Sequence, residues 1–327
     1  MAHVFDPITI KHLSLDNRLV MPPMATAKAD ENGRVTDAAC DYYRERAKYS
    51  KIGLIITEHS YIHLQGKAHP GQTSLASDDV ISSFARLTDC IHQEGVKVFA
   101  QLSHAGSAAM SKITGQSPVG PSCVYHPKQK NELPLEMTVQ QIHEVTGWFA
   151  QAARRAKQAG FDGVELHSAH GYLLNQFFSP LANQRTDAYG AQSVETRTRF
   201  HLEVIQAVRD AVGAAFPISV RLGGCDYAAG GSTVADCVEA CRIFEKSGVD
   251  LLHLTGGMNG YVRPGHSEPG YFRDLSIPVK QAVHIPVLLT GGVTTLSQAE
   301  TLLTEGCADL VGVGRAIYKN AHWADEG

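Results

Sequence analysis

The chain has 327 residues, 43% of them hydrophobic and 19% charged, and a formal net charge of -4 at pH 7. This composition can form a large core, and the scattered lysines and arginines argue against a nucleic-acid or anionic-membrane partner. There are seven cysteines and no C-x-x-C pair, so no disulfide framework is expected. The chain has no apolar run of ~18 residues and no signal-like start, and we therefore expect a soluble cytoplasmic protein.

Strands and helices alternate from one end of the chain to the other. Residues 3–16 combine short apolar pieces with turn formers and predict a small hairpin. The next strand begins at Arg18 and ends at Pro22 and Pro23, because proline cannot donate to a strand ladder and fixes φ. Seven further apolar runs predict buried strands at residues 53–59, 96–104, 163–167, 218–222, 251–255, 287–290 and 310–315.

Helices are predicted between most of these strands. Thr36 can cap the first helix, and Thr138 with Gln141 has the spacing of a capping box. Periodic apolar faces place helices at residues 35–49, 78–94, 138–160, 234–248 and 296–305, with another that ends near Val212. Eight successive strands favour an α/β fold, a single (β/α)8 TIM barrel over residues 1–327 with the N-terminal β-hairpin as a plug, over an open doubly wound sheet.

Two segments carry no readable motif. Residues 105–134 form a long loop with several glycines and prolines, and a long loop in a compact domain usually covers a site or carries function. Residues 257–275 follow the strand at 251–255. We expect both segments to shape a pocket.

The strand at residues 163–167 leads directly into three side chains that can carry chemistry. His167, His170 and Tyr172 lie at its C-terminal end, where α/β folds place their active sites. Imidazoles can hydrogen-bond a carbonyl or nitro oxygen, and a phenol can donate a proton to a carbanion. An electrophilic clamp with an acid is one interpretation; a metal-binding pair or two packed core histidines is the alternative.

The other strand ends also bear polar residues or glycines, and in a barrel all of these ends face one mouth. The residues at these ends are Pro23, Met24, Glu58, His59, Gln101, His104, Arg221, Gly291, Gly292, Gly314 and Arg315. Such convergence is more specific than any single residue.

Gln101 and Arg221 suggest what the mouth binds. An amide and a fixed cation suit a flat heterocycle with imide edges that becomes negative on reduction. The alternative for Arg221 is a buried ion pair with Glu165, and both interactions are compatible.

The last two strands end in glycines followed by predicted helices. Gly291, Gly292, Gly314 and Arg315 can present backbone N–H groups to a phosphate, as barrels often do at this position. The alternative is that the glycines only make tight turns. A dinucleotide fingerprint fails because Ile317 stands where glycine or alanine is needed, and no G-x-x-x-x-G-K-[ST] motif occurs.

These residues together resemble the old yellow enzyme family of FMN-dependent ene-reductases. The resemblance covers essentially the whole chain and is carried by these motifs: Asn17 to Thr26, Gln101-Leu-Ser-His-Ala-Gly106, His167 to Gln176, Ser179-Pro-Leu181, Asn183-Gln-Arg185-Thr-Asp-x-Tyr189-Gly190, Arg221, Gly291-Gly292 and Gly314-Arg315. It implies a (β/α)8 barrel with FMN in its mouth and NADPH or NADH as electron donor. The His-x-x-His form is similar to the bacterial and dienoyl-CoA-reductase-like branches.

The resemblance also implies a role for each matching residue. The proton donor would be Tyr172, while His167 and His170 would grip the activating oxygen of an α,β-unsaturated substrate. The residues that would contact the flavin are Pro23, Met24 and Ala25 behind the ring, with His59 and His167 beside it, Gln101 at the pyrimidine edge, Arg221 at N1/O2, and Gly291, Gly292, Gly314 and Arg315 at the phosphate. The resemblance leaves a homo-oligomer open.

The chain departs from the family pattern at several positions. Ala25 stands where many relatives have threonine or cysteine, so either the flavin potential is tuned differently or Thr26 substitutes. Ser107 stands where arginine is frequent, and the turn at Gly190-Ala-Gln-Ser193 has one extra residue. The chain ends at Gly327 without a cysteine-rich extension, so we expect no iron-sulfur cluster and no subunit-crossing C-terminal arginine.

Three functions follow as hypotheses. The first is an FMN-dependent NAD(P)H oxidoreductase that reduces an activated C=C bond with hydride from flavin N5 and a proton from Tyr172. The second is a metal-dependent barrel hydrolase or aldolase that uses His167, His170 and Glu165. The third is a non-catalytic flavin-binding protein. The sequence does not indicate the natural substrate or the preferred nicotinamide.

Overall fold

A closed parallel barrel forms the centre of the molecule. The computed structural model describes residues 2–325, and within them eight strands pair in the order β4-β3-β13-β12-β11-β10-β9-β6, with β4 and β6 closing the ring. These strands are β3 (Leu19–Met21), β4 (Leu54–Ile56), β6 (Lys97–Ser103), β9 (Gly163–Ser168), β10 (Ile218–Cys225), β11 (Leu251–Gly256), β12 (Val287–Thr290) and β13 (Leu310–Gly312). The predicted (β/α)8 barrel is confirmed.

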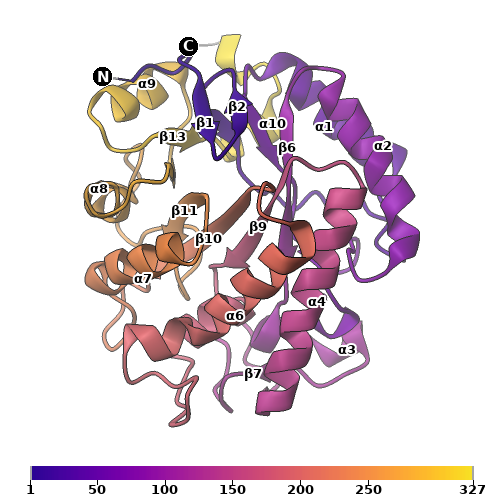
Figure 1. The fold of residues 1–327 in the computed structure, drawn as a ribbon, viewed down its shortest axis with the longest axis vertical. Coiled ribbons are helices and arrows are strands. Elements are labelled where there is room, and N and C mark those ends of the chain that lie inside the picture. Colours follow the sequence, from indigo (N-terminus) through magenta and orange to yellow (C-terminus); the bar gives the residue numbers. More distant parts are fainter. Residues whose placement is uncertain (1, 326–327) are drawn as a thin grey trace.

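Helices surround the barrel and cover the outer faces of its strands (Figure 1). They are α1 (Asp37–Tyr49), α2 (Ile81–His92), α4 (Val139–Gln158), α6 (Val194–Val212), α7 (Val234–Lys246), α8 (Arg273–Ala282), α9 (Leu296–Thr304) and α10 (Arg315–Lys319). The predicted caps are present: Thr36 accepts the backbone N–H of Ala39, and Thr138 and Gln141 form a reciprocal capping box. None of the described helices is long and apolar enough to cross a membrane.

The N-terminal hairpin plugs one end of the barrel. Its strands β1 (Ile8–Ile10) and β2 (Leu13–Leu15) pair antiparallel. Ile10 and Leu15 are buried in a small cluster with residues from the barrel interior, Val20, Leu54, Ile56, Phe99, Leu251, Leu288 and Leu310. In Figure 1 the hairpin lies at the end of the molecule opposite α3 (Ser111–Thr114) and β7 (Val119–Gly120), which belong to the loop after β6. The expected plug is therefore confirmed.

Several short elements were not predicted from the sequence. Helix α8 lies in the region after residue 257, and Pro278 within it interrupts the helical pattern. Helix α5 (Leu173–Phe178) has all six residues buried, so it shows no amphipathic period. The 105–134 loop contains α3 and β7, and β7 pairs in parallel with β8 (Leu135–Glu136). β5 (Ser60–Tyr61) extends the edge of β6.

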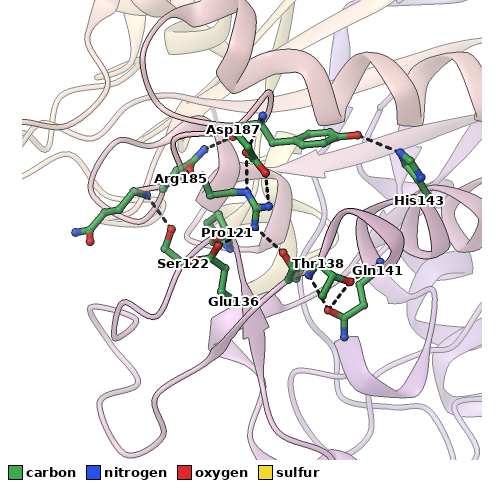
Figure 2. Close-up of polar contacts among 12 residues, drawn as sticks. Pro121, Ser122, Glu136, Thr138, Gln141, His143, Arg185 and Asp187 are labelled. Carbon is green, nitrogen blue, oxygen red and sulfur yellow. Dashed lines mark hydrogen bonds and ion pairs between the residues drawn. The ribbon is translucent and has the colours of Figure 1, made fainter.

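Arg185 fastens this long loop to the segment that follows α5 (Figure 2). Its guanidinium donates to both carboxylate oxygens of Asp187, at 3.0 and 2.5 Å, and to the carbonyl oxygens of Pro121 and Met137, at 3.2 and 2.6 Å. The side chain of Arg185 is 5% exposed. One buried cation thus holds together two segments that are far apart in the sequence.

Replacing Arg185 with alanine is expected to lower the free energy of unfolding by about 2–3 kcal/mol, because two carbonyls and the carboxylates of Asp187 and Glu136 lose their cationic partner. Urea denaturation measures this loss. Arg199→Ala is the matched control: its ion pair with Glu203 is made by a 52% exposed arginine, so a loss of at most about 0.5 kcal/mol is expected. Equal losses in the two variants would contradict the anchoring role.

The ion pair between Arg185 and Asp187 should make a pH-dependent contribution to the stability of the fold. Its hydrogen bonds hold the pKa of Asp187 below the ordinary value. A depressed pKa in the folded state stabilises the fold above the unfolded-state pKa, and this contribution is lost as pH falls through the folded-state pKa. The stability difference between wild type and Arg185→Ala should therefore narrow below about pH 4. A difference that stays constant down to pH 2 would contradict this contribution.

Candidate active site

A cavity of about 470 Å³ opens at the C-terminal ends of the barrel strands. Every residue to which the resemblance gave a role lines it: Pro23, Met24, Ala25, His59, Gln101, His167, His170, Tyr172, Arg221, Gly291, Gly292, Gly314 and Arg315. Two other strand-end residues expected at the mouth, Glu58 and His104, do not line it, because both are buried against other parts of the chain: Glu58 accepts from Thr26, and His104 stacks near Trp148. Three cationic side chains, Lys128, Arg221 and Arg315, also face the cavity, and no carboxylate of the described chain is among its lining residues. The cavity is therefore electrostatically suited to an anionic ligand.

The turn after β9 brings the two histidines and the tyrosine together. The ring centroids of His167 and His170 are 5.3 Å apart, and those of His167 and Tyr172 are 4.9 Å apart. His170 has φ 59° and Gly171 has φ 78°, so the chain reverses within two residues. Asn175 fixes the turn by accepting the N–H of Gly171 at 2.8 Å.

Burial keeps both histidines neutral. It lowers the pKa of His167 and of His170 well below the ordinary value, and the nearby Arg221 cation lowers both further. The Nε2 atom of His170 lies 3.1 Å from the hydroxyl of Thr255. Neutral imidazoles at pH 7 can act as N–H donors to a substrate oxygen without carrying charge.

Tyr172 contacts a histidine from another strand end. Its hydroxyl lies 3.2 Å from Nε2 of His59, which follows β4. Burial raises the pKa of Tyr172 well above 10. The phenol is therefore protonated at pH 7, as a proton donor must be.

Glu165 is hydrogen-bonded to side chains from three other barrel strands. It is fully buried, and its carboxylate accepts from Nε2 of Gln101 at 2.8 Å, from the hydroxyl of Ser219 at 3.1 Å and from Nδ1 of His253 at 2.9 Å. Burial alone would raise the pKa of Glu165, but the interactions with His253, Arg221 and Gln101 together outweigh burial, and the pKa is lowered. Strand register explains the first two contacts, because Gln101 and Ser219 are the direct neighbours of Glu165 in β6 and β10.

The sequence left open whether Arg221 forms a buried ion pair with Glu165, and the structure shows no such pair. Within residues 2–325, no ion pair joins the two side chains, and Nε of Arg221 is buried without a hydrogen-bond partner. Nδ1 of His167 is likewise buried and unpartnered in this part of the chain. Both residues line the cavity, and buried polar side chains with unused hydrogen-bonding capacity at a cavity are the kind of groups that a bound ligand engages.

These groups fit the flavin ring of FMN. Gln101 gives its N–H to Glu165 and so keeps its carbonyl oxygen as an acceptor, which suits an imide N–H. Arg221 brings a cation with an unused N–H, which suits a carbonyl edge that gains negative charge. The donor and acceptor set thus matches the pyrimidine end of the ring.

The glycine-lined corner fits a phosphate. Gly291 and Gly292 have φ 119° and 74°, and a Cβ on Gly291 would lie 2.7 Å from the ring of Tyr271. Gly314 precedes the first turn of α10, and Arg315 begins it. Gly291 and Gly292 therefore make a tight turn, as the alternative held, and these glycines also line the cavity together with Gly314 and Arg315, which suits the approach of a phosphate.

Ala25 is not compensated by its neighbour. The hydroxyl of Thr26 donates to Glu58 at 2.5 Å, and its N–H donates to the same carboxylate at 3.0 Å. Ala25 lines the cavity and Thr26 does not. The expected alternative that Thr26 supplies the missing hydroxyl is therefore wrong.

The metal-dependent alternative needs a cluster of metal-binding side chains, and the described residues do not provide one. In the described part of the chain, no three His, Cys, Asp or Glu side chains are grouped so that they could hold a metal ion. Glu165, the carboxylate that this alternative needs, is bound to His253. The metal-dependent hypothesis therefore has no geometric support.

Among the lining residues that sequence reasoning did not assign to the site are Lys128, Thr255, Tyr261, Tyr271 and Thr290. Thr255 and Thr290 stand at the ends of β11 and β12, so the strand-end rule could have found them. The other three lie in loops, where no local pattern indicates which side chain reaches the mouth.

Gly171→Ala should destabilise the turn after β9. A Cβ at Gly171 would lie 2.4 Å from Nε2 of His126 in the long loop, and φ is 78°. We expect a loss of about 3 kcal/mol in stability from strain and overlap together, measured by thermal unfolding. Gly115→Ala is the matched control, because its φ is 70° but nothing lies within 4 Å, so only about 1 kcal/mol of strain is expected.

Comparison with known proteins identifies a family and several related proteins. A family model described as the NADH:flavin oxidoreductase / NADH oxidase family matches residues 3–326. A metal reductase of Desulforamulus reducens is 42% identical over 320 residues, which are 97% of this chain but 47% of the relative, so the chain spans about half its length. An NADPH dehydrogenase of Bacillus subtilis is 36% identical over 322 residues, 98% of this chain and 93% of that protein.

A solved structure of similar fold also matches the chain. The structure of an old yellow enzyme homologue from Zymomonas mobilis matches with a TM-score of 0.86 and 27% identity, over 98% of this chain and 90% of that one.

Proposed function

The chain belongs to the NADH:flavin oxidoreductase / NADH oxidase family, and on that basis we propose that it is an FMN-dependent NAD(P)H oxidoreductase that reduces the activated C=C bond of α,β-unsaturated carbonyl compounds. The resemblance to old yellow enzyme is confirmed by the family model and the Zymomonas structure. The observation that carries the proposal is the convergence of two neutral histidines, a protonated phenol and an unpartnered buried arginine on one cavity.

FMN, when bound, supplies the redox chemistry: it accepts a hydride from the nicotinamide and passes it to the acceptor. The chain holds it. Arg221 and Gln101 would bind the pyrimidine end of the ring, and Arg315 with the neighbouring glycine N–H groups would bind the phosphate. Pro23, Met24 and Ala25 would lie behind the ring, with His59 and His167 beside it.

The substrate side of the cavity is formed by the turn after β9. His167 and His170 would donate N–H groups to the activating oxygen of the acceptor and so stabilise the negative charge that develops there. Tyr172 would give its proton to the α-carbon. A neutral clamp suits this task, because it polarises the carbonyl without protonating it.

We also propose that residues 1–327 act as one domain. The eight barrel strands form one closed sheet, and residues from near both ends of the chain, from Pro22 after β3 to Tyr318 in α10, line the same cavity. The flavin and the acceptor would therefore bind within this unit.

The test is a two-step assay on the purified, FMN-loaded protein. The visible spectrum is expected to bleach under anaerobic conditions with NADPH or NADH, and to recover on addition of a cyclic enone with formation of the saturated ketone. A flavin-loaded protein that neither nicotinamide reduces would contradict the proposal. A protein that is reduced but passes hydride to no enone would favour a flavin-binding role without this reaction.

A further inference from the structure

The phenol of Tyr172 has one side-chain hydrogen-bond partner within residues 2–325, Nε2 of His59 at 3.2 Å. The two residues are 113 positions apart in the sequence and come from different strand ends. Their ring centroids are 5.5 Å apart. Both line the cavity. The function proposed above assigns Tyr172 as an acid but leaves this contact unexplained.

A buried phenol loses its proton less readily than a phenol in water. Burial raises the pKa of Tyr172, because the phenolate would lose the solvation that water provides. A hydrogen-bond donor aimed at the phenol oxygen offsets part of that cost, and preorganised donors of this kind contribute strongly to catalysis. His59 occupies the required position.

The surroundings of His59 keep its imidazole neutral. Burial, followed by the nearby His69 and Arg221, lowers the pKa of His59 to about 3. The ring of His69 lies 5.4 Å from that of His59, the ring of His167 lies 6.3 Å away, and Glu58 precedes it in the chain. At pH 5 to 8 the imidazole therefore carries one N–H.

We propose that His59 is the positioning residue of Tyr172: its Nε2–H donates to the phenol oxygen, directs the O–H toward the cavity and stabilises the phenolate. This inference rests on the proposed function. As the O–H bond of Tyr172 breaks, a C–H bond forms at the α-carbon of the acceptor, and the negative charge passes to the phenolate oxygen. Water that enters through the mouth then returns one proton to the phenolate.

The test is a double-mutant cycle on the FMN-loaded protein. His59→Leu removes the donor and is expected to slow reoxidation of the flavin by an enone about 10²-fold, the effect of losing one such donor. This loss should be at least tenfold larger than the change in flavin reduction by NAD(P)H, the half-reaction that reports any loss of contact between His59 and the flavin. His59→Gln keeps an N–H near the same point and should recover at least tenfold of that loss. His69→Gln, a neighbouring histidine that does not line the cavity, should change the rate less than threefold.

The cycle separates positioning from a merely structural effect. In a Tyr172→Phe background, His59→Leu should cost less than threefold, because the group on which it acts is gone. Independent, multiplicative losses would overturn the inference. If Tyr172→Phe itself leaves reoxidation unchanged, the acid role in the proposed function fails instead, so the two failures are distinguishable.

A second readout does not depend on turnover. In protein labelled with ¹⁵N-histidine, the His59 signals, identified by their absence in His59→Gln, should show a neutral ring with protonated Nε2 from pH 5 to 8. The Nε2 signal should shift in Tyr172→Phe. A ring that carries its proton on Nδ1, or a signal that Tyr172→Phe leaves in place, would overturn the inference.

Discussion

Tyr172→Phe is expected to slow reoxidation of the reduced enzyme by an enone by about 10²- to 10³-fold, the usual contribution of a positioned general acid. Reduction by NAD(P)H needs no proton from this residue and should change less than threefold. Stopped-flow absorbance measures the two half-reactions separately. The cavity supports this expectation, because His167 and His170 are neutral there and the protonated phenol of Tyr172 lies directly beside His167.

The control for this prediction is Tyr125→Phe. Tyr125 is 52% exposed on the long loop and does not line the cavity, so both half-reactions should keep their wild-type rates. Equal slowing of reduction and reoxidation in Tyr172→Phe would show that the residue supports flavin binding or folding and does not act as the acid.

Arg221→Met is expected to weaken FMN binding about 10- to 100-fold, the loss of one charge-assisted hydrogen bond worth about 1.5–3 kcal/mol. Arg221 is 6% exposed, and its Nε has no partner in the described chain. Burial lowers its pKa to about 10, so it is still a cation at pH 7. Fluorescence quenching on titration of the deflavinated protein with FMN measures the affinity.

The same substitution should not destabilise the flavin-free protein. A buried cation without a direct ion pair carries a desolvation cost that the more distant Glu165 offsets only in part, and methionine fills much of the same volume without that cost. Arg197→Met is the matched control: Arg197 is 5% exposed but bonded to Asp236 at 2.7 Å, so it should lose about 3 kcal/mol of stability and keep its FMN affinity. Reversed behaviour of the two variants would refute the assignment of Arg221.

Individual residues show which features of the site could be predicted from the sequence and which could not. Strands could be found because each is a buried apolar run with a defined end, and the strand-end rule then placed His167 and Arg221 in one mouth. The partner of Glu165 could not be found in this way. Strand alternation puts several polar side chains on one face, and only packing decides that His253 and not Arg221 makes the contact.

The sequence by itself determined the barrel, its plug and the residues at the strand ends, because hydrophobic period, proline stops and glycine turns act over a few neighbouring positions. Tertiary structure alone decided the pairing of Tyr172 with His59, the commitment of Thr26 to Glu58, and the presence of Lys128, Tyr261 and Tyr271 at the mouth. These contacts depend on loop paths and side-chain directions across distant segments, and no local pattern encodes them.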